Sequence, residues 1–482
     1  MEDELEPMSP TAQYLKSSSL SLAIIGVLES ETPIDDSMLM PFIKDDFLPL
    51  NSRFSSVVVI TKNEGTRKWK KVEVNLNDHV KIPIFPSGMS IEYYDKCFTE
   101  YLSQIGTQQF PQNKPFWEIH IIKYPTKNAA GNIIFKLHHS LGDGYSFMSA
   151  LLSCLKRTEN PLLPLSFPSR QSNSRPNNNI NRGDGSFGSV SKFLTKLLGT
   201  DFGWNIFMSH LIEDDKSSIR SGGDGVEFRS FVTSTITFSM DQIQEIKSRL
   251  QVTINDVITG VIFFGTRIYM QESRNTNEKS GEEKCTALVL LNTREMGGYK
   301  PVKEMIKEDA KMPWGNRLTF LPIPLPKLEN PIEIIKKARE KIKKQRKSNT
   351  VNVTSQLLQL IGEVRGPEAT GNYIHKLLKN ASMTISNMIG PVEKMELASH
   401  PIKGLYWTLS GPPQSLTITM VSYLKNLRVA ITVEKNFIDL DKFKSCIYHA
   451  FNEISRAALD SRMSKQQVSK NHTFRNEAPS RL

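Results

Sequence analysis

The stretch "IIFKLHHSLGDGYSF", residues 133–147, sets two adjacent histidines before an aspartate that lies between two glycines. An imidazole with an ordinary pKa of roughly 6.5 can take a proton from a hydroxyl group near neutral pH. The carboxylate of Asp143 could hold the shape of the loop by pairing with a distant arginine, while His139 stays free to act as a base. Adjacent histidines at a strand end are more often structural than catalytic, so residue type alone leaves both interpretations open.

The elements around this motif would place it at a cleft. An apolar run, residues 133–137, is typical of a buried strand, and the apolar side chains of residues 147–155 recur at helical spacing. The motif therefore occupies a strand-to-helix loop, from which a rigid scaffold can present side chains. Gly142 and Gly144 leave room beside the backbone for a substrate or a facing strand.

Short apolar runs alternate with helical patterns along most of the chain, which predicts a mixed α/β fold in both halves. In the first half we expect a helix over residues 90–105 and strands over residues 55–60, 117–122 and 132–137. In the second half we expect helices over residues 240–250, 254–271 and 440–459, and strands over residues 233–239, 286–292, 381–387, 415–423 and 427–434.

At 482 residues, with 39% hydrophobic residues, the chain is long enough for two domains with real cores. Residues 158–189 are rich in Pro, Ser, Asn and Gly and are typical of a flexible linker. The expected division is an N-terminal domain, residues 1–157, and a C-terminal domain, residues 190–460. Residues 461–482 are expected to form a basic, disordered tail.

The formal net charge of +11 is concentrated in two segments. Residues 333–347 hold eight Lys/Arg against two Glu, and residues 461–482 hold five against one, so the rest of the chain is close to neutral. A nucleic-acid-binding protein would spread its basic residues over a folded face with aromatics between them, so we expect no nucleic-acid partner. Residues 333–347 are typical of a solvated helix face, with anionic lipid or CoA phosphate as alternative partners.

Metal binding and bilayer crossing are both disfavoured. The four cysteines lie far apart and form no CxxC pair, so we expect neither a metal site nor a disulfide framework. No stretch reaches the roughly 18 to 20 apolar residues that span a bilayer. The most apolar candidate, residues 187–212, is interrupted by charged residues and fits either a helix in a membrane interface or one packed on the protein itself.

The heptapeptide "HHSLGDG", residues 138–144, resembles the HHxxxDG motif of CoA-dependent acyltransferases, and its surroundings resemble the plant branch of the wax ester synthase/diacylglycerol O-acyltransferase family. HHxxxDG alone is shared with condensation domains of peptide synthetases, whereas the motifs that follow in the same order are more specific. These motifs are "PFWEIHII" (115–122), "TINDVITGV" (253–261), "LLNTRE" (290–295), "WGNRLTFLPIPLP" (314–326) and "SNMIGPVE" (386–393).

The resemblance covers nearly the whole chain and implies both a fold and an activity. The fold would be two domains similar to chloramphenicol acetyltransferase, with mixed sheets and the active-site tunnel between them. The activity would be transfer of an acyl group from acyl-CoA, as co-substrate and without a bound cofactor, to a long-chain fatty alcohol, giving a wax ester, or to diacylglycerol, giving triacylglycerol. The enzyme would be located at the cytosolic face of the endoplasmic reticulum membrane, with the plasma membrane as an alternative location.

The resemblance also implies roles for individual residues. His139 would be the general base that takes the proton of the alcohol hydroxyl, while CoA thiol leaves without a covalent enzyme intermediate. Asp143 would be structural, with Arg294 as its partner. Asn255 and Asp256 match the family's Asn-Asp motif as support for the site, with a helix N-terminal cap as the alternative. His138 and Gly144 belong to the motif without an assigned role, and no residue is assigned to CoA.

Other interpretations remain open at this stage. The sequence "DFGW" at 201–204 is reminiscent of soluble plant acyltransferases that pair HxxxD with DFGWG, but Asn205 replaces the glycine and the motif lies too close to Asp143. Residues 422–427, "SYLKNL", lack the Asp-Gly of bacterial members. Residues 315–316 and 386–387 are expected to be turns at the domain interface. A lipid-binding protein without catalytic activity is the non-enzymatic alternative. The sequence does not determine the preferred acceptor or the chain length.

Overall fold

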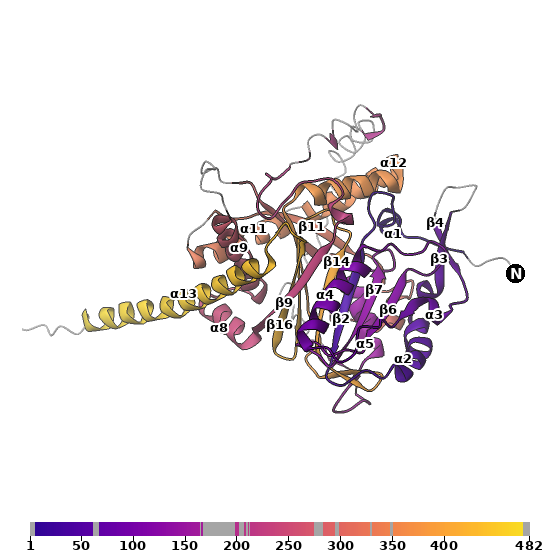
Figure 1. Cartoon of the computed structure of the whole chain (residues 1–482). Helices are drawn as coiled ribbons and strands as arrows, with labels where there is room; N and C mark the ends of the chain where they lie inside the picture. Colours follow the sequence, from indigo (N-terminus) through magenta and orange to yellow (C-terminus); the bar gives the residue numbers. More distant parts are fainter. Residues whose placement is uncertain are drawn as a thin grey trace, which may run out of the picture.

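Two large mixed β-sheets with helices packed on them, and a small three-stranded sheet in the order β1-β4-β3, make up most of the described part of the chain (Figure 1). The computed structural model describes residues 5–60, 67–163, 165–166, 198–201, 207–208, 211, 213–273, 283–294, 298–327, 330–347 and 350–475, the side chains of 346–353 and of 461–475 being left aside. The α/β class and the two-sheet architecture expected from the sequence are confirmed.

The first sheet has seven strands in the order β5-β6-β7-β2-β14-β13-β8. Their bounds are β2 (Ala23–Ser30), β5 (Val80–Lys81), β6 (Trp117–Ile122), β7 (Gly131–His138), β8 (Lys156–Arg157), β13 (Met395–Leu397) and β14 (His400–Ser410). Helix α4 (Ile91–Thr107) packs on the face that carries Ile25 and Val27, and α5 (Gly144–Cys154) packs on the face that carries Ile24 and Leu28. Both faces of β2 are therefore buried, which explains its continuous apolar sequence.

Strands β13 and β14 correct the expected domain boundary. They come from the part of the sequence that we assigned to the C-terminal domain, residues 190–460, yet β14 pairs along the whole of β2 in the first sheet, from Ser410 opposite Ala23 to Ile402 opposite Ser30. The chain therefore crosses between the sheets, so the linker does not separate two contiguous domains. Strand β14 is buried along most of its length, and a central place in a sheet satisfies its backbone groups.

The second sheet has six strands in the order β11-β10-β12-β15-β16-β9. Their bounds are β9 (Phe231–Ser239), β10 (Thr286–Asn292), β11 (Leu318–Pro324), β12 (Met383–Met388), β15 (Leu416–Tyr423) and β16 (Asn426–Glu434). The helices α8 (Met240–Leu250), α9 (Ile254–Glu272), α11 (Pro331–Lys347) and α13 (Leu440–Arg475) gather on one side of it (Figure 1). Buried residues lie all around α9, as expected for a helix inside a core.

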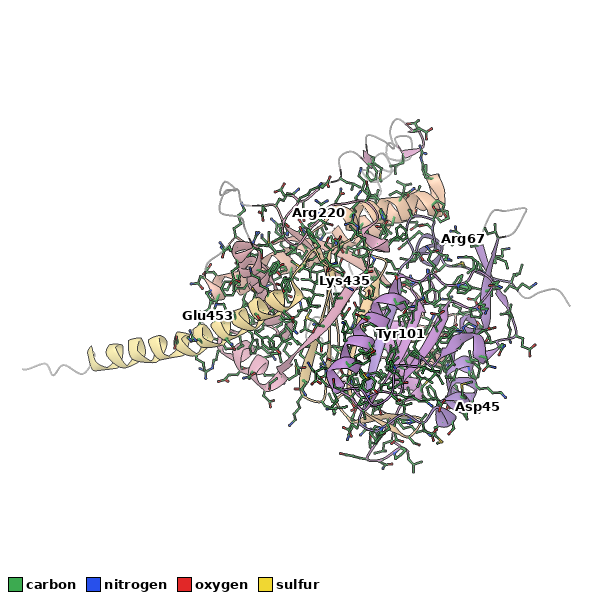
Figure 2. All side chains as sticks on the ribbon, viewed as in Figure 1. Asp45, Arg67, Tyr101, Arg220, Lys435 and Glu453 are labelled. Carbon is green, nitrogen blue, oxygen red and sulfur yellow. The ribbon has the colours of Figure 1, made fainter. Side chains whose placement is uncertain are left out.

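Contacts between distant segments tie the two sheets together. Glu29 on β2 forms an ion pair with Arg428 on β16, and the hydroxyl groups of Thr408 on β14 and Thr432 on β16 are hydrogen-bonded. Arg67 of β4 (Arg67–Lys71), labelled in Figure 2, ties the small third sheet to the second half of the chain by pairing with Glu368 on α12 (Thr350–Asn380). The sheets are thus fixed against each other by polar contacts as well as by apolar packing.

Several short strands and helices complete the fold, most of them in the first half of the chain. They are β1 (Leu5–Pro7), β3 (Ser56–Ile60), α1 (Pro10–Tyr14), α2 (Asp36–Phe42), η1 (Ile43–Phe47), η2 (Leu48–Leu50), η3 (Ser52–Ser55) and α3 (Leu76–His79), with η4 (Val226–Phe228) and α10 (Val302–Met305) in the second half. The strands and helices expected from periodicity are confirmed, with ends shifted by at most a few residues except at the C-terminal end of α13. The central strands β2 and β14 and the edge strand β11 were not expected.

Three expectations about surface segments can be compared with the structure. Helix α13 continues to Arg475, so residues 461–475 are helical and the expectation of a disordered tail is wrong for them; residues 476–482 lie outside the described part. Figure 1 shows this end of α13 extending away from both sheets. Helix α11 buries Ile334, Ile335, Ala338 and Ile342 and exposes Lys336, Lys337, Lys343 and Lys344, which confirms a solvated helix face.

The apolar segment 187–212 lies mostly outside the described residues. Of those described, Leu198 is fully buried and Phe207 stacks on Tyr373 of α12, with ring centroids 5.6 Å apart. These residues pack on the protein itself. Within the described ranges, no helix combines the length and the apolar character that crossing a membrane requires.

Candidate active site

The HHxxxDG segment forms the loop between β7 and α5, as the sequence predicts. Strand β7 ends at His138, and Asp143 caps the N-terminus of α5 by accepting a hydrogen bond of 2.9 Å from the backbone N–H of Ser146. The backbone N–H of His139 donates to the carbonyl of Leu22, at 2.8 Å. This bond holds His139 beside the start of β2.

Asp143 does not contact the histidines, because both of its oxygens are occupied elsewhere. Its Oδ2 accepts from Arg294 at 2.7 Å and from the backbone N–H of Arg317 at 2.8 Å, and its Oδ1 accepts from Arg294 at 3.1 Å. The side chain of Arg294 is fully buried and that of Asp143 nearly so. The expected Asp143–Arg294 pair is therefore present, in the two-pronged geometry that makes such pairs strong.

The same guanidinium group fixes a second loop. Arg294 donates to the carbonyls of Pro313, at 3.0 Å, and Gly315, at 2.7 Å, and its guanidinium lies over the ring of Tyr145, 4.7 Å from the centroid. Residues 313–317, which come just before β11, are thereby held against the HHxxxDG loop. The sequence gives no local sign of this contact, because the two loops are far apart along the chain.

Asn316, in this second loop, determines which nitrogen of His139 carries the proton. Its side-chain NH₂ donates to the backbone carbonyl of His139 at 2.8 Å, so its Oδ1 must be the atom that lies 2.8 Å from Nδ1 of the ring. An amide oxygen can only accept, so Nδ1 of the neutral ring carries the proton and Nε2 has a free lone pair. His139 is thus in the tautomer that a general base needs.

His139 is buried, and burial shifts its pKa below the ordinary value of 6.5. The negative charge of Asp143 and the hydrogen bond to Asn316 act in the opposite direction but are smaller effects. The ring is therefore mostly neutral near neutral pH, with Nε2 ready to take a proton.

His139 lines a cavity of about 480 Å³ between the two sheets. Ile24 and Trp407 line it from the first sheet, and Leu290 and Ile385 line it from the second. Besides His139, the polar residues of its wall are Asp143, Tyr145, Asn255, Thr259, Asn292, Tyr299, Arg317, Ser386 and Asn387. The expected location of a site between the two halves agrees with this cavity.

His138 has a different environment and is not among the residues that line the cavity. Its Nδ1 accepts from the backbone N–H of Ser140 at 3.1 Å, so its proton sits on Nε2, 3.1 Å from the hydroxyl of Ser21. The rings of Phe110 and Phe116 pack against it, and burial places its pKa well below the ordinary value. His138 is therefore a neutral structural residue at the end of β7.

Asn255 and Asp256 have separate roles. The carboxylate of Asp256 accepts from the backbone N–H of Thr253 at 2.9 Å, and the Thr253 hydroxyl accepts from the N–H of Asp256 at 3.1 Å. This is a capping box at the start of α9, so the cap alternative holds for Asp256. Asn255 instead lines the cavity, where its Oδ1 accepts from Asn387 at 3.2 Å.

Gly144 is required by a close neighbour. A Cβ atom at this position would lie 2.6 Å from the sulfur of Met388, so any side chain would displace Met388 from the cavity wall. The prediction of glycine as a source of space is borne out at this position.

Several residues have a larger role in the site than we predicted from the sequence. Residues 315–316 and 386–387 were expected to be mere turns, but Asn316 binds His139, and Asn387 belongs to β12 and lines the cavity. Tyr145 and Tyr299 also line the cavity, with their rings stacked 4.6 Å apart. Of these residues, only Asn316, the asparagine that follows "WG" in the motif at 314–316, could have been recognised from the sequence as a candidate site residue. Among the described residues no cluster of His, Cys, Asp or Glu suits a metal ion.

Two family models match the chain. The model described as "Wax ester synthase/diacylglycerol acyltransferase catalytic domain" matches residues 46–204, and the "WS/DGAT C-terminal domain" matches residues 314–455. Together they include strands of both large sheets, the HHxxxDG loop and Asn316.

Relatives and solved structures agree with these matches. The chain is 27% identical over 466 residues to wax ester synthase/diacylglycerol acyltransferase 4 of Arabidopsis thaliana, covering 92% of this chain and 88% of the relative. It is 26% identical to wax ester synthase/diacylglycerol acyltransferase 5 of the same plant, covering 92% of this chain and 92% of the relative. The structure of a wax ester synthase/diacylglycerol acyltransferase from Marinobacter aquaeolei VT8 superimposes with a TM-score of 0.59 at 16% identity, covering 94% of this chain and 99% of that one.

A more distant match supports the fold alone. The first condensation domain of the CDA synthetase superimposes with a TM-score of 0.54 at 11% identity and covers 94% of each chain.

The buried pair Asp143–Arg294 yields a prediction about stability. Replacing Arg294 with Leu leaves the Asp143 carboxylate buried without its charged partner, which typically costs roughly 3–5 kcal/mol. We expect urea unfolding to report a loss of this size. The double variant Asp143→Asn with Arg294→Leu should recover part of it, because no buried charge then remains. Equal stability of the single and double variants would contradict this account.

Proposed function

Because the chain belongs to the wax ester synthase/diacylglycerol acyltransferase family and is an acyltransferase, we propose that it moves a fatty acyl group from acyl-CoA to the hydroxyl of a long-chain alcohol, with His139 as general base. The observation that carries this proposal is a His139 that lines the cavity between the sheets with its Nε2 unprotonated. A lipid-binding protein without catalysis would have no need for this tautomer.

The reaction follows from the position of that lone pair. Nε2 takes the proton of the alcohol hydroxyl while the oxygen attacks the thioester carbonyl carbon. The tetrahedral intermediate then collapses, the carbon–sulfur bond breaks, and the imidazolium returns its proton to the leaving thiolate of CoA. General-base catalysis of this kind typically contributes roughly 10²- to 10⁴-fold to the rate.

The surroundings of His139 stabilise the imidazolium that forms during the reaction. Its Nδ1–H remains hydrogen-bonded to Asn316, and the negative charge of Asp143 favours the charged ring. The carboxylate of Asp143 is paired with Arg294, so Asp143 acts as a positioning residue and not as a proton acceptor.

The character of the cavity supports an acceptor that has a hydroxyl group on an apolar body. Val289, Leu291 and Ile385 give it an apolar wall, while Asn255 and Asn387 offer hydrogen-bonding groups. Long-chain alcohol and diacylglycerol both present a hydroxyl on an apolar body, and we propose the alcohol as the preferred acceptor. No bound cofactor is required for this chemistry, with acyl-CoA acting as co-substrate.

His139→Ala tests the catalytic proposal. With purified protein, palmitoyl-CoA and an equimolar mixture of hexadecanol and diacylglycerol, we expect the wild type to give more wax ester than triacylglycerol. The variant should lose roughly 10²- to 10⁴-fold in ester formation, because the hydroxyl then lacks its base. Thin-layer separation of the products measures both outcomes.

Two results would contradict this proposal. Ester formation by the His139 variant at the wild-type rate would exclude the histidine base, and a product dominated by triacylglycerol would exclude the preference for alcohol. His138→Gln serves as the control for folding, because His138 lies next to His139 but does not line the cavity.

The pH profile tests the tautomer and the lowered pKa. A base must be neutral, so kcat/KM should rise with pH through the pKa of His139, with its midpoint below 6.5. In Asn316→Asp, a carboxylate beside Nδ1–H would favour the imidazolium, so the midpoint should move to higher pH. Asn316→Ala should lower kcat by roughly 10- to 100-fold. A midpoint that is unchanged in Asn316→Asp would contradict the claim that the contact between residue 316 and Nδ1 of His139 controls the protonation of the ring.

The proposal extends to peripheral attachment at the cytosolic face of the endoplasmic reticulum, where apolar substrates gather. Helix α11 exposes Lys336, Lys343 and Lys344, and each lysine near an anionic surface contributes roughly 1 kcal/mol. Replacing these three with Gln should weaken flotation with phosphatidylserine vesicles by at least about tenfold. The variant Lys303→Gln, Lys307→Gln, Lys311→Gln has the same net charge and should retain binding; equal losses would show a charge effect without a defined surface.

A further inference from the structure

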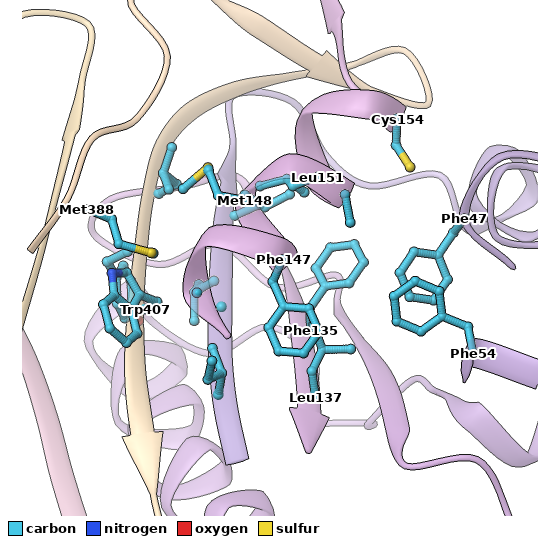
Figure 3. A pocket seen from close by; sticks show the side chains of 18 of the residues that line it. Phe47, Phe54, Phe135, Leu137, Phe147, Met148, Leu151, Cys154, Met388 and Trp407 are labelled. Carbon is cyan, nitrogen blue, oxygen red and sulfur yellow. The ribbon is translucent and has the colours of Figure 1, made fainter. Parts of the chain in front are cut away.

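A second, smaller space lies beside the cavity of His139, beneath α5. This apolar pocket has a volume of about 70 Å³ and is shown in Figure 3. Phe135 and Phe147 lie at its centre, with Phe47 and Phe54 on one side and Met388 and Trp407 on the other. A pocket lined in this way stays dry when empty and favours an apolar occupant.

The pocket and the cavity share part of their walls. The pocket and the cavity are adjacent at four residues that line both of them: Ile24, Gly144, Met388 and Trp407. The close approach of Met388 to Gly144 lies at this junction. An aliphatic chain whose reactive end is beside His139 would enter the pocket past these residues.

The register of the strands gives the direction of such a chain. Ala23 on β2 pairs with His138, and Gly26 pairs with Phe135, so Gly26 lies three residues further from the catalytic loop. At 3.3–3.4 Å per residue this is a distance of roughly 10 Å. The pocket thus extends along β2 and β7 away from His139.

Gly26 is unusual because nothing in the packing requires a glycine there. A Cβ atom at Gly26 would meet nothing within 4 Å, whereas one at Gly131 or Gly404, the other glycines of the described strands, would lie within 3 Å of a neighbour. Gly26 has no left-handed backbone that would demand glycine. Glycine weakens a strand interior and is often found where a ligand approaches closely. The space above Gly26 therefore belongs to the pocket.

We propose that this pocket binds the distal methylene groups of one substrate chain and that Gly26 sets the length of chain that fits. The inference rests on the proposed function, of which it specifies the substrate. At roughly 10–15 Å³ for each water-sized group, the pocket holds roughly five to seven methylene groups. Gly26 is flanked across the sheet by Phe135 and Trp407, so a side chain added there has only the pocket to occupy.

The graded series Gly26→Ala, Gly26→Val and Gly26→Leu tests this proposal. Each buried methylene contributes roughly fourfold to binding, and valine adds three carbon atoms, so we expect kcat/KM for the longest chain to fall by about 60-fold in Gly26→Val. Activity on octanoyl or octanol substrates should stay near the wild-type value. Retained activity on short chains also shows that the variants are folded.

Two arms of the assay identify which substrate provides the chain. In one, the acyl-CoA varies from octanoyl to stearoyl with a fixed alcohol; in the other, the alcohol varies with palmitoyl-CoA fixed. The arm whose optimum shortens contains the chain that occupies the pocket. Leu151→Ala, which enlarges the same pocket, should move that optimum towards longer chains. An unchanged optimum in both arms for Gly26→Val and Gly26→Leu would overturn the inference.

A binding measurement separates this inference from the proposed function. Hexadecanoate or hexadecanol should raise the Tm of both the wild type and His139→Ala, since neither lacks the pocket, and should raise the Tm of Gly26→Leu much less. His139→Ala that forms ester would overturn the catalytic proposal alone. Equal stabilisation of wild type and Gly26→Leu, or none in the wild type, would overturn the pocket.

Discussion

The buried ion pair between Asp143 and Arg294 is the contact on which the site depends. Removing two charges from water is costly, and the cost is offset only when every donor and acceptor finds a partner. Here the carboxylate accepts from Arg294, from the cap of α5 and from the backbone of Arg317, while the guanidinium also donates to Pro313 and Gly315. The loop after β7 and the loop before β11 are thereby fixed against each other.

The catalytic arrangement follows from this pair. Once residues 313–317 are held in place, Asn316 meets His139 with both ends of its amide, which sets the tautomer of the ring. Burial keeps that ring neutral, and the ring lines the cavity between the sheets. The same burial leaves His138 as a neutral member of the aromatic core. One dipeptide thus divides into a proposed base and a structural residue because the two rings face different surroundings.

The sequence predicts what local pattern encodes. Strand and helix periodicity located most elements, and the HHxxxDG spacing indicated His139, Asp143 and a distant arginine. Pairing of β14 with β2 was missed, because no local pattern specifies a partner several hundred residues away. Asn316 was missed for the same reason: its contact with His139 crosses from one loop to another. Asp256 was overestimated, because an Asp at this position of a helix caps the helix whether or not a site is near.

The most direct test of the central claim is the tautomer of His139, which nitrogen-15 NMR of histidine-labelled protein measures from the protonation of each ring nitrogen, with assignment by the His138→Gln variant. The account predicts a neutral ring with the proton on Nδ1 for His139 and on Nε2 for His138 at neutral pH. A His139 ring protonated at Nε2 would contradict it, because the atom that faces the alcohol would then have no lone pair to accept a proton.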